Sequence, residues 1–288
     1  MKLSDVIGSW LEVNRTFVKE LMANRERSRN IKFHYNDIYK EVHQSDQICF
    51  VLSTGRCGTK LLSKMFTMSE EVEDHHATLP EMYYFDRYAY ENHKSAHGEL
   101  MKMIDAARYE LIRKSILVDK TYIETNNRIT FFAYQLAELF PQAKFIHLIR
   151  NPISFVKSGV GRNWYEGDNY NNEGRIVPVG REEEFAKWPI EEKVAWLWNE
   201  TNQFIHDFKS TLPQERVLTV VAEDLFKKPE VTRSIYDFIG VPSLSDAVIS
   251  KTISKPVNKG KKSASPSLSE DQKKRVMEIA KINQEYYS

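Results

Sequence analysis

Residues 48–62 read Ile-Cys-Phe-Val-Leu-Ser-Thr-Gly-Arg-Cys-Gly-Thr-Lys-Leu-Leu. The first five, Ile48 to Leu52, form an uninterrupted apolar run, whose length and content predict a buried parallel strand. A loop with two glycines and two cationic residues follows at 53–60. From Leu61 onward the apolar residues recur at helical spacing, which predicts an amphipathic helix. The stretch therefore predicts a strand, a cationic loop and the start of a helix.

This arrangement has the chemistry of an anion site. The amide groups at the start of a helix point outward, and the helix dipole favours negative charge there. Gly55 and Gly58 let the backbone approach a phosphate closely, while Arg56, Thr59 and Lys60 offer side-chain donors. The same residues also fit an ordinary strand–turn–helix with basic residues on its surface.

The loop does not match the nucleoside-triphosphate P-loop. That motif requires Gly-x-x-x-x-Gly-Lys-Ser/Thr. Here Ser53 stands five residues before Gly58, and the order that follows is Thr59-Lys60 instead of Lys-Thr. The usual interpretation of a glycine-bearing loop at this position is therefore excluded.

Composition narrows the class of protein. The chain has 288 residues, of which 41% are hydrophobic and 28% charged, as in globular α/β proteins. The net charge of +1 argues against a nucleic-acid partner held by phosphate contacts. The two cysteines, Cys49 and Cys57, suggest no disulfide framework. No apolar run reaches the ~18 residues of a membrane span and no signal peptide is evident, so we expect a cytoplasmic protein.

The remaining pattern predicts an N-terminal helical extension over 1–46, with a helix at 3–23, and an α/β domain over 47–288. Helices are expected at 99–113, 127–140, 152–160, 190–210 and 271–285, and strands at 116–118, 144–149 and 217–221. Residues 161–188 have no clean period and suit a loop that covers substrate. Strands alternating with helices predict a mainly parallel, doubly wound sheet flanked by helices.

A second stretch with functional character begins in the strand at 144–149. Arg150 follows that strand directly, and Ser158 lies on the next predicted helix. An arginine fork with a nearby hydroxyl suits a phosphate monoester. Taken alone, Arg150 fits a structural ion pair equally well. Because ligands of doubly wound sheets bind at the carboxyl ends of the strands, this stretch and the loop are expected at one edge.

Together the two stretches resemble sulfotransferases that use 3′-phosphoadenosine 5′-phosphosulfate (PAPS). Residues 53–62 resemble the family's 5′-phosphosulfate loop, although Cys57 stands where that loop usually has serine. Arg150-Asn151-Pro152, followed by Ser158-Gly159, resembles its 3′-phosphate motif. Weaker likenesses lie at Val118–Thr121 and in the Glu223-Asp224-Leu225 segment. The resemblance spans roughly 48–262 and implies the P-loop-like sulfotransferase fold.

The resemblance implies transfer of a sulfuryl group from PAPS to a hydroxyl or amine acceptor by in-line displacement, leaving 3′-phosphoadenosine 5′-phosphate (PAP), with no metal. The acceptor would be a small molecule, a lipid or a saccharide, and a homodimer is compatible with the sequence. The implied cofactor-binding residues are Thr54, Gly55, Arg56, Cys57, Gly58, Thr59, Lys60, Arg150, Ser158, Lys259 and Gly260.

Catalysis on a hydroxyl needs a general base within hydrogen-bond reach. His76 is the first candidate, followed by His75 and Glu81, and Glu124 is also considered. The resemblance further implies that Arg56 stabilises the leaving phosphate and that Lys120 lies beside the acceptor. Two alternatives remain open. One is an ATP-dependent small-molecule kinase with Asp119 as a magnesium ligand, and the other is a nucleotide-binding protein without catalysis.

Overall fold

The computed structural model describes residues 35–167, 170–254, 267–282 and 286–287. The chain divides into two compact units, 1–41 and 42–288. In the first unit, the described residues belong to helix α2 (Tyr35–His43), which continues into the second. The predicted helix at 3–23 lies outside the described residues. The sheet lies within residues 42–288.

The described part of this unit is built on a five-stranded parallel sheet. Its strands are β1 (Ile48–Leu52), β2 (Val72–His75), β3 (Thr121–Glu124), β4 (Lys144–Ile149) and β5 (Val217–Val221). They are arranged in the order β2-β3-β1-β4-β5, and each neighbouring pair is parallel. Strand β1 is buried at all five positions because it lies in the middle of the sheet.

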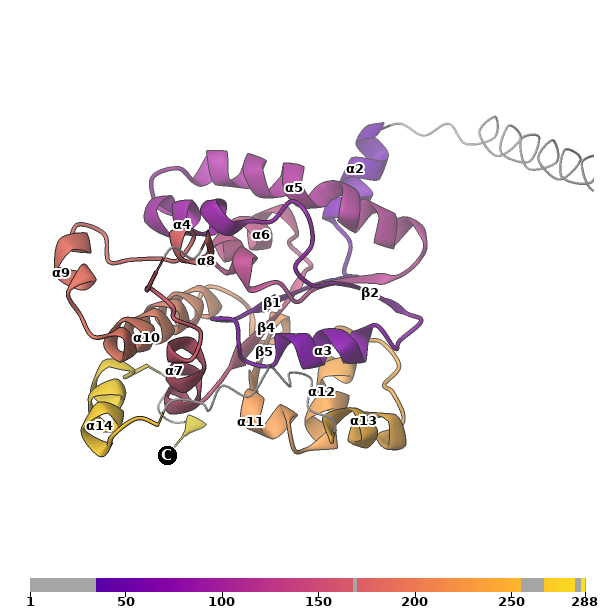
Figure 1. The fold of residues 1–288 in the computed structure, drawn as a ribbon. Helices are drawn as coiled ribbons and strands as arrows, with labels where there is room; N and C mark the ends of the chain where they lie inside the picture. The colour runs from indigo at the N-terminus through magenta and orange to yellow at the C-terminus, as the bar shows by residue number, and fades with distance from the viewer. Residues whose placement is uncertain (1–34, 168–169, 255–266, 283–285, 288) are drawn as a thin grey trace, which may run out of the picture. The chain divides into compact units, whose positions relative to one another are not determined.

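Helices cover both faces of the sheet, as expected for a doubly wound fold (Figure 1). Helix α3 (Thr59–Phe66) and helix α12 (Pro229–Ile239) lie on one face. Helices α5 (His97–Leu117), α6 (Ala133–Leu139) and α10 (Ile190–Lys209) lie on the other. The chain thus leaves β1 toward one face and β4 toward the other, which opens a crevice between their carboxyl ends.

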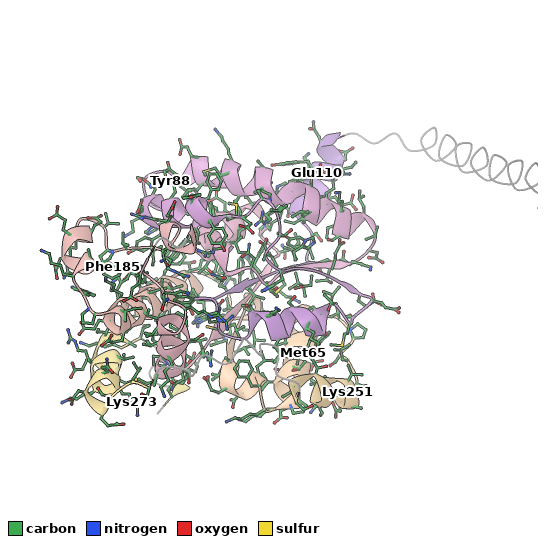
Figure 2. The ribbon with its side chains drawn as sticks, in the orientation of Figure 1. Met65, Tyr88, Glu110, Phe185, Lys251 and Lys273 are labelled. Atoms are coloured by element: carbon green, nitrogen blue, oxygen red, sulfur yellow. The ribbon has the colours of Figure 1, made fainter. Side chains whose placement is uncertain are left out.

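The two helices of the first face are joined by side-chain contacts. Met65 of α3 lies against α12 (Figure 2), where its carbonyl accepts a hydrogen bond of 3.0 Å from the Tyr236 hydroxyl. On the opposite face, the rings of Phe145 and Phe208 pack edge to face with centroids 5.0 Å apart. The residues of β1 and most of those of β4 are buried between these layers.

Several predicted elements are confirmed. The strands at 144–149 and 217–221 and the helix at 152–160 have the predicted bounds. Pro152 occupies the first turn of that last helix, α7 (Pro152–Val160), and the Asn151 side chain caps it. The predicted helix at 127–140 is a 3₁₀ turn, Asn127–Phe132, followed by α6.

The other helices complete the described structure. They are α4 (Tyr83–Asn92), α8 (Tyr170–Glu173), α9 (Glu182–Ala186), α11 (Ala222–Leu225), α13 (Asp246–Ile253), α14 (Glu270–Ile279) and the 3₁₀ turn Gln214–Arg216. Two of them, α8 and α9, are short helices within the segment at 161–188, which was predicted as a loop.

The predicted strand at 116–118 is wrong. Helix α5 continues to Leu117, and the side chains of Leu117 and Val118 are 52% and 60% exposed. The chain turns at Asp119, which has a φ of 57°, and the strand begins at Thr121. Three apolar residues at the end of a long helix cannot be distinguished from a short buried strand by period alone.

Candidate functional site

The loop after β1 has a backbone that requires its glycines. Gly55 and Gly58 have φ values of 74° and 101°, and Arg56 between them also has a positive φ of 56°. A Cβ on Gly58 would lie 2.7 Å from the Phe226 ring, so a larger residue does not fit. Thr130 holds the start of the loop by exchanging hydrogen bonds with the Ser53 backbone. The loop is therefore fixed in shape before any ligand binds.

Cys57 points into this loop. Its side chain is 1% exposed, its thiol donates to the Gly55 carbonyl at 3.1 Å, and Sγ lies 3.0 Å from the Thr54 hydroxyl. Burial raises the pKa of this thiol to about 11. The protonated thiol thus braces the loop from inside, and the loop's other face is left for a ligand.

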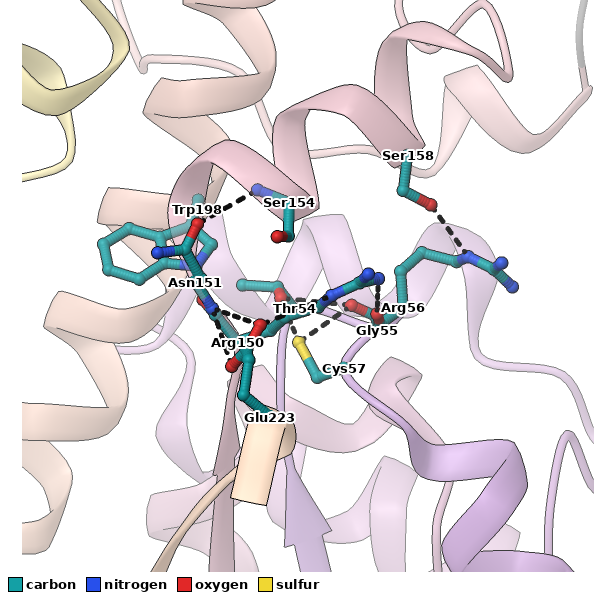
Figure 3. A network of polar contacts seen from close by, with 10 residues as sticks. All are labelled: Thr54, Gly55, Arg56, Cys57, Arg150, Asn151, Ser154, Ser158, Trp198 and Glu223. Carbon is teal, nitrogen blue, oxygen red and sulfur yellow. Dashed lines mark hydrogen bonds and ion pairs between the residues drawn. The ribbon is translucent and has the colours of Figure 1, made fainter. Parts of the chain in front are cut away.

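Arg150 and Ser158 meet the loop through Arg56 (Figure 3). The Arg150 guanidinium donates to the Arg56 carbonyl at 2.8 Å, and Arg56 Nε donates to Ser158 Oγ at 3.3 Å. The position of Arg150 is fixed in turn by Trp198, whose indole donates to the Arg150 carbonyl at 2.8 Å. The two stretches that the sequence analysis singled out therefore form one hydrogen-bonded network.

This network carries more positive charge than its neighbours balance. Burial lowers the pKa of Arg56, and the charges of Arg162 and Arg150 lower it further. Arg150 Nε is buried and has no hydrogen-bond partner among the described residues, since Glu223 Oε1 is 3.9 Å away. A bound dianion would relieve this repulsion and supply the missing acceptor.

A cavity of about 490 Å³ opens beside the loop. Its walls come from the ends of β1, β2 and β3 and from the segment that follows α7. The lining residues are Thr54, Gly55, Arg56, His76, Ala77, Glu81, Met82, Tyr83, Asn126, Asn127, Arg128, Gly161, Arg162, Trp164 and Arg175. It thus combines part of the loop with two of the candidate bases.

His76 lies in this cavity with a defined orientation. Its Nδ1 is 3.0 Å from the Thr125 hydroxyl, which donates to Asp74 Oδ1 at 3.1 Å. Because the hydroxyl has only one hydrogen and gives it to Asp74, it must accept from His76 Nδ1–H. In the neutral ring, Nε2 is then the nitrogen without a hydrogen, and it can accept a proton.

The other candidate bases differ in position. Glu81 is exposed and lines the cavity. His75 does not line it; its ring stacks on Tyr122 with centroids 4.6 Å apart, and burial lowers its pKa. Glu124 is fully buried and accepts hydrogen bonds from Arg108, Tyr122 and Asn126, so it has a structural role.

The structure does not bring every predicted site residue to this edge. Lys120 directly precedes β3, so it lies at the amino end of the strand, opposite the loop. Asp119 lies beside it, which removes the carboxylate that the kinase alternative required. Thr59 is buried and Lys60 exposed in the first turn of α3, while Lys259 and Gly260 lie outside the described residues.

Among the described residues, no group of three or more His, Cys, Asp or Glu side chains is placed to hold a metal ion. In the same part of the chain, no helix is both long and apolar enough to cross a membrane.

Sequence reasoning missed several cavity residues. Asn126, Asn127 and Arg128 follow β3, whose position was predicted wrongly. Arg162 stands only four residues after Ser158, which was a usable signal. Arg175 lies in the segment without a clean period, where no motif indicates a functional residue.

Comparisons with known proteins found a matching family model and several similar solved structures. A model of the sulfotransferase family matches residues 49–246. Among solved structures, a sulfotransferase domain from the curacin biosynthetic pathway is 19% identical, with a TM-score of 0.48 over 75% of this chain and 81% of that one. A sulfotransferase from Alicyclobacillus acidocaldarius is 14% identical, with a TM-score of 0.45 over 81% of this chain and 90% of that one. No curated protein sequence matches the chain.

Proposed function

Because the chain belongs to the sulfotransferase family, we propose that it transfers a sulfuryl group from PAPS to a hydroxyl or amine of a small acceptor. The observation that carries this proposal is the contact of the loop with Arg150 and Ser158 through Arg56. PAPS has anionic groups at both its 5′ and 3′ positions. The loop with its two glycines could bind the 5′ group, and the neighbouring arginine–serine pair could bind the 3′ group.

The residues divide between these two groups. The loop amides and the first turn of α3, with Thr59 and Lys60, would hold the 5′-phosphosulfate. Arg150 and Ser158 would hold the 3′-phosphate. Arg56, which contacts both parts, would stabilise negative charge as it develops on the leaving phosphate. The buried Arg150 Nε and the repulsion among Arg56, Arg150 and Arg162 support this fit.

PAPS, when bound, supplies a sulfuryl group on a good phosphate leaving group. The chain must then remove a proton from the acceptor. His76 is suited to this role because its Nδ1–H donates to Thr125, which donates in turn to Asp74, so that Nε2 is left to accept the acceptor's proton. Asp74 stabilises the imidazolium that forms. Glu81 is the second candidate base in the same cavity.

Calorimetry with PAP, AMP and ADP tests the nucleotide assignment. We expect PAP to bind most tightly, and Ser158→Ala to weaken PAP by about tenfold with little effect on AMP. Ser154→Ala, on the same helix, is the matched control. Equal affinity for PAP and AMP in the wild type, or activity with ATP and magnesium but none with PAPS, would refute the proposal.

Turnover of PAPS, measured as PAP release in the presence of screened acceptors, tests the base. His76→Ala should reduce turnover by about 10²–10⁴-fold while PAP affinity is unchanged. His97→Ala is the control, since His97 is half exposed and pairs with Glu138 away from the cavity. Full activity in His76→Ala would exclude His76 as the base and direct attention to Glu81.

A further inference from the structure

We propose that the acceptor carries an anionic group, a phosphate, sulfate or carboxylate, which Arg128 and Arg175 bind. This inference rests on the proposed sulfuryl transfer, since it concerns the second substrate in the same cavity. Both arginines line the cavity of about 490 Å³ beside the loop, and both also line a small adjoining pocket. The charge, burial and orientation of these two side chains carry the proposal.

The cavity contains two groups of arginines. Arg56 interacts electrostatically with Arg150 and Arg162, and this group is accounted for by the phosphates of the donor. Arg175 interacts with Arg128, and neither belongs to the loop or to the arginine–serine pair. The second group is therefore additional to what the donor requires.

Its charge is not balanced by the surrounding protein. Arg175 is 9% exposed, and within the described residues no carboxylate lies at ion-pair distance from it. The nearest acid to Arg128 is Asp86, whose Oδ2 is 3.9 Å away. Even with Asp86 and the cavity's Glu81 fully ionised, these two carboxylates are outnumbered by the four arginines that line the cavity. Burial lowers the pKa of Arg175 to about 10, so it remains charged at neutral pH.

Both guanidinium groups lie over aromatic rings. Arg175 lies 3.9 Å from the centroid of the Trp164 ring, and Arg128 lies 4.0 Å from that of Tyr83. The attraction between a guanidinium and a ring face restrains the side chain and leaves its N–H groups available for an oxyanion. Arg175 Nε donates to Asn172 Oδ1, and its two terminal nitrogens form no hydrogen bond with another described residue. Two guanidinium groups in one cavity, each restrained by an aromatic ring and with N–H groups to spare, can together bind an anion.

The size of the cavity limits the acceptor. About 490 Å³ accommodates a small molecule or the end of a longer chain. The acceptor class that fits is a small hydroxyl or amine compound that already carries an oxyanion. The charge would anchor it, and the hydroxyl would reach His76.

Calorimetry on the PAP-saturated protein tests this inference, because PAP occupies the donor's phosphate sites. The probes are inorganic sulfate and the pair glucose 6-phosphate and glucose. We expect both anions to bind, and glucose to bind at least about tenfold more weakly than its phosphate. Arg175→Gln and Arg128→Gln should each weaken the anions by about tenfold and leave PAP affinity unchanged. Arg128→Lys should retain part of the binding.

Arg181→Gln is the matched control, since Arg181 also lies near a tryptophan but is 57% exposed and pairs with Glu184. If Arg175→Gln does not fold, as judged by circular dichroism, the anion affinity of Arg128→Gln tests the inference. Absence of anion binding to the wild type, or unchanged binding in the folded variants, would overturn the inference. If PAP does not bind at all, the proposed function fails. Sulfate binding that is lost in Arg175→Gln would then still support the anion site.

Discussion

Replacement of Gly58 by alanine should disable the loop for two separable reasons. The φ of 101° lies in a region that L-residues rarely adopt, and holding alanine there costs about 1–3 kcal/mol. The new Cβ would also lie 2.7 Å from Cε1 and 3.1 Å from Cζ of Phe226, and such overpacking costs about 1–3 kcal/mol. Together these effects amount to about 2–6 kcal/mol, a large part of the ~5–15 kcal/mol that stabilises a typical domain.

Three further variants separate the two causes. Gly180→Ala has a positive φ of 75° but no atom within 4 Å of the new Cβ, so it carries the backbone cost alone. Gly98→Ala, in an open position of α5, should be neutral or stabilising by up to about 1 kcal/mol. Gly58→Ala combined with Phe226→Leu should recover part of the loss, because the smaller side chain relieves the contact.

Urea unfolding followed by circular dichroism measures the stability of each variant, and calorimetry measures PAP affinity. We expect Gly58→Ala to lose both, whereas Gly180→Ala loses only stability. The reasoning would be refuted if Gly58→Ala were no less stable than Gly180→Ala, or if Phe226→Leu gave no recovery.

Three other predictions follow from buried polar groups. Arg108→Met should destabilise the protein by about 3–5 kcal/mol because it leaves the Glu124 carboxylate buried and unpaired, and urea unfolding should show recovery when Glu124→Leu is added. Burial lowers the pKa of His147 from 6.5 to about 3, so the folded state resists a proton that the unfolded state accepts. Wild-type stability should therefore fall as the pH drops from 6.5 toward 3. The stability of His147→Leu should depend less steeply on pH in acid unfolding. Equal slopes for the two proteins would contradict this prediction. Cys57→Ser should keep PAP affinity in calorimetry because a hydroxyl makes the same two contacts, whereas Cys57→Val should weaken it. Alkylation of the native thiol should be slow because burial raises its pKa.

The three strands that the sequence predicted correctly share one property. Strand β1 is an uninterrupted apolar run, and β4 and β5 are mostly apolar, so they can be recognised without information from distant residues. Strand β2, Val72-Glu-Asp-His, lies at the edge of the sheet and was missed because only its first residue is apolar and buried. Strand β3 ends in the fully buried Glu124, which depends on Arg108 from a different element. No local pattern indicates that pairing.

The candidate site also contains one part that local sequence motifs predict and one part that they do not. The loop and the Arg150–Ser158 pair are local motifs, and the structure brings them together as the parallel sheet requires. The cavity arginines Arg128 and Arg175 are more than 40 residues apart in sequence and converge only because α4 and the segment after α7 close over the strand ends. Their unbalanced charge is a property of the folded arrangement, so the sequence could not predict it.

Cys57 shows how the structure resolves an apparent mismatch in the motif. The cysteine stands where the related loops usually have serine. The thiol faces Thr54 and Gly55, inside the loop. The Cys57 side chain therefore stabilises the loop itself. Its thiol can donate and accept hydrogen bonds, as a serine hydroxyl would. The groups that we propose to hold the ligand are the loop amides, Arg56, Thr59 and Lys60, and the exchange of serine for cysteine does not alter them.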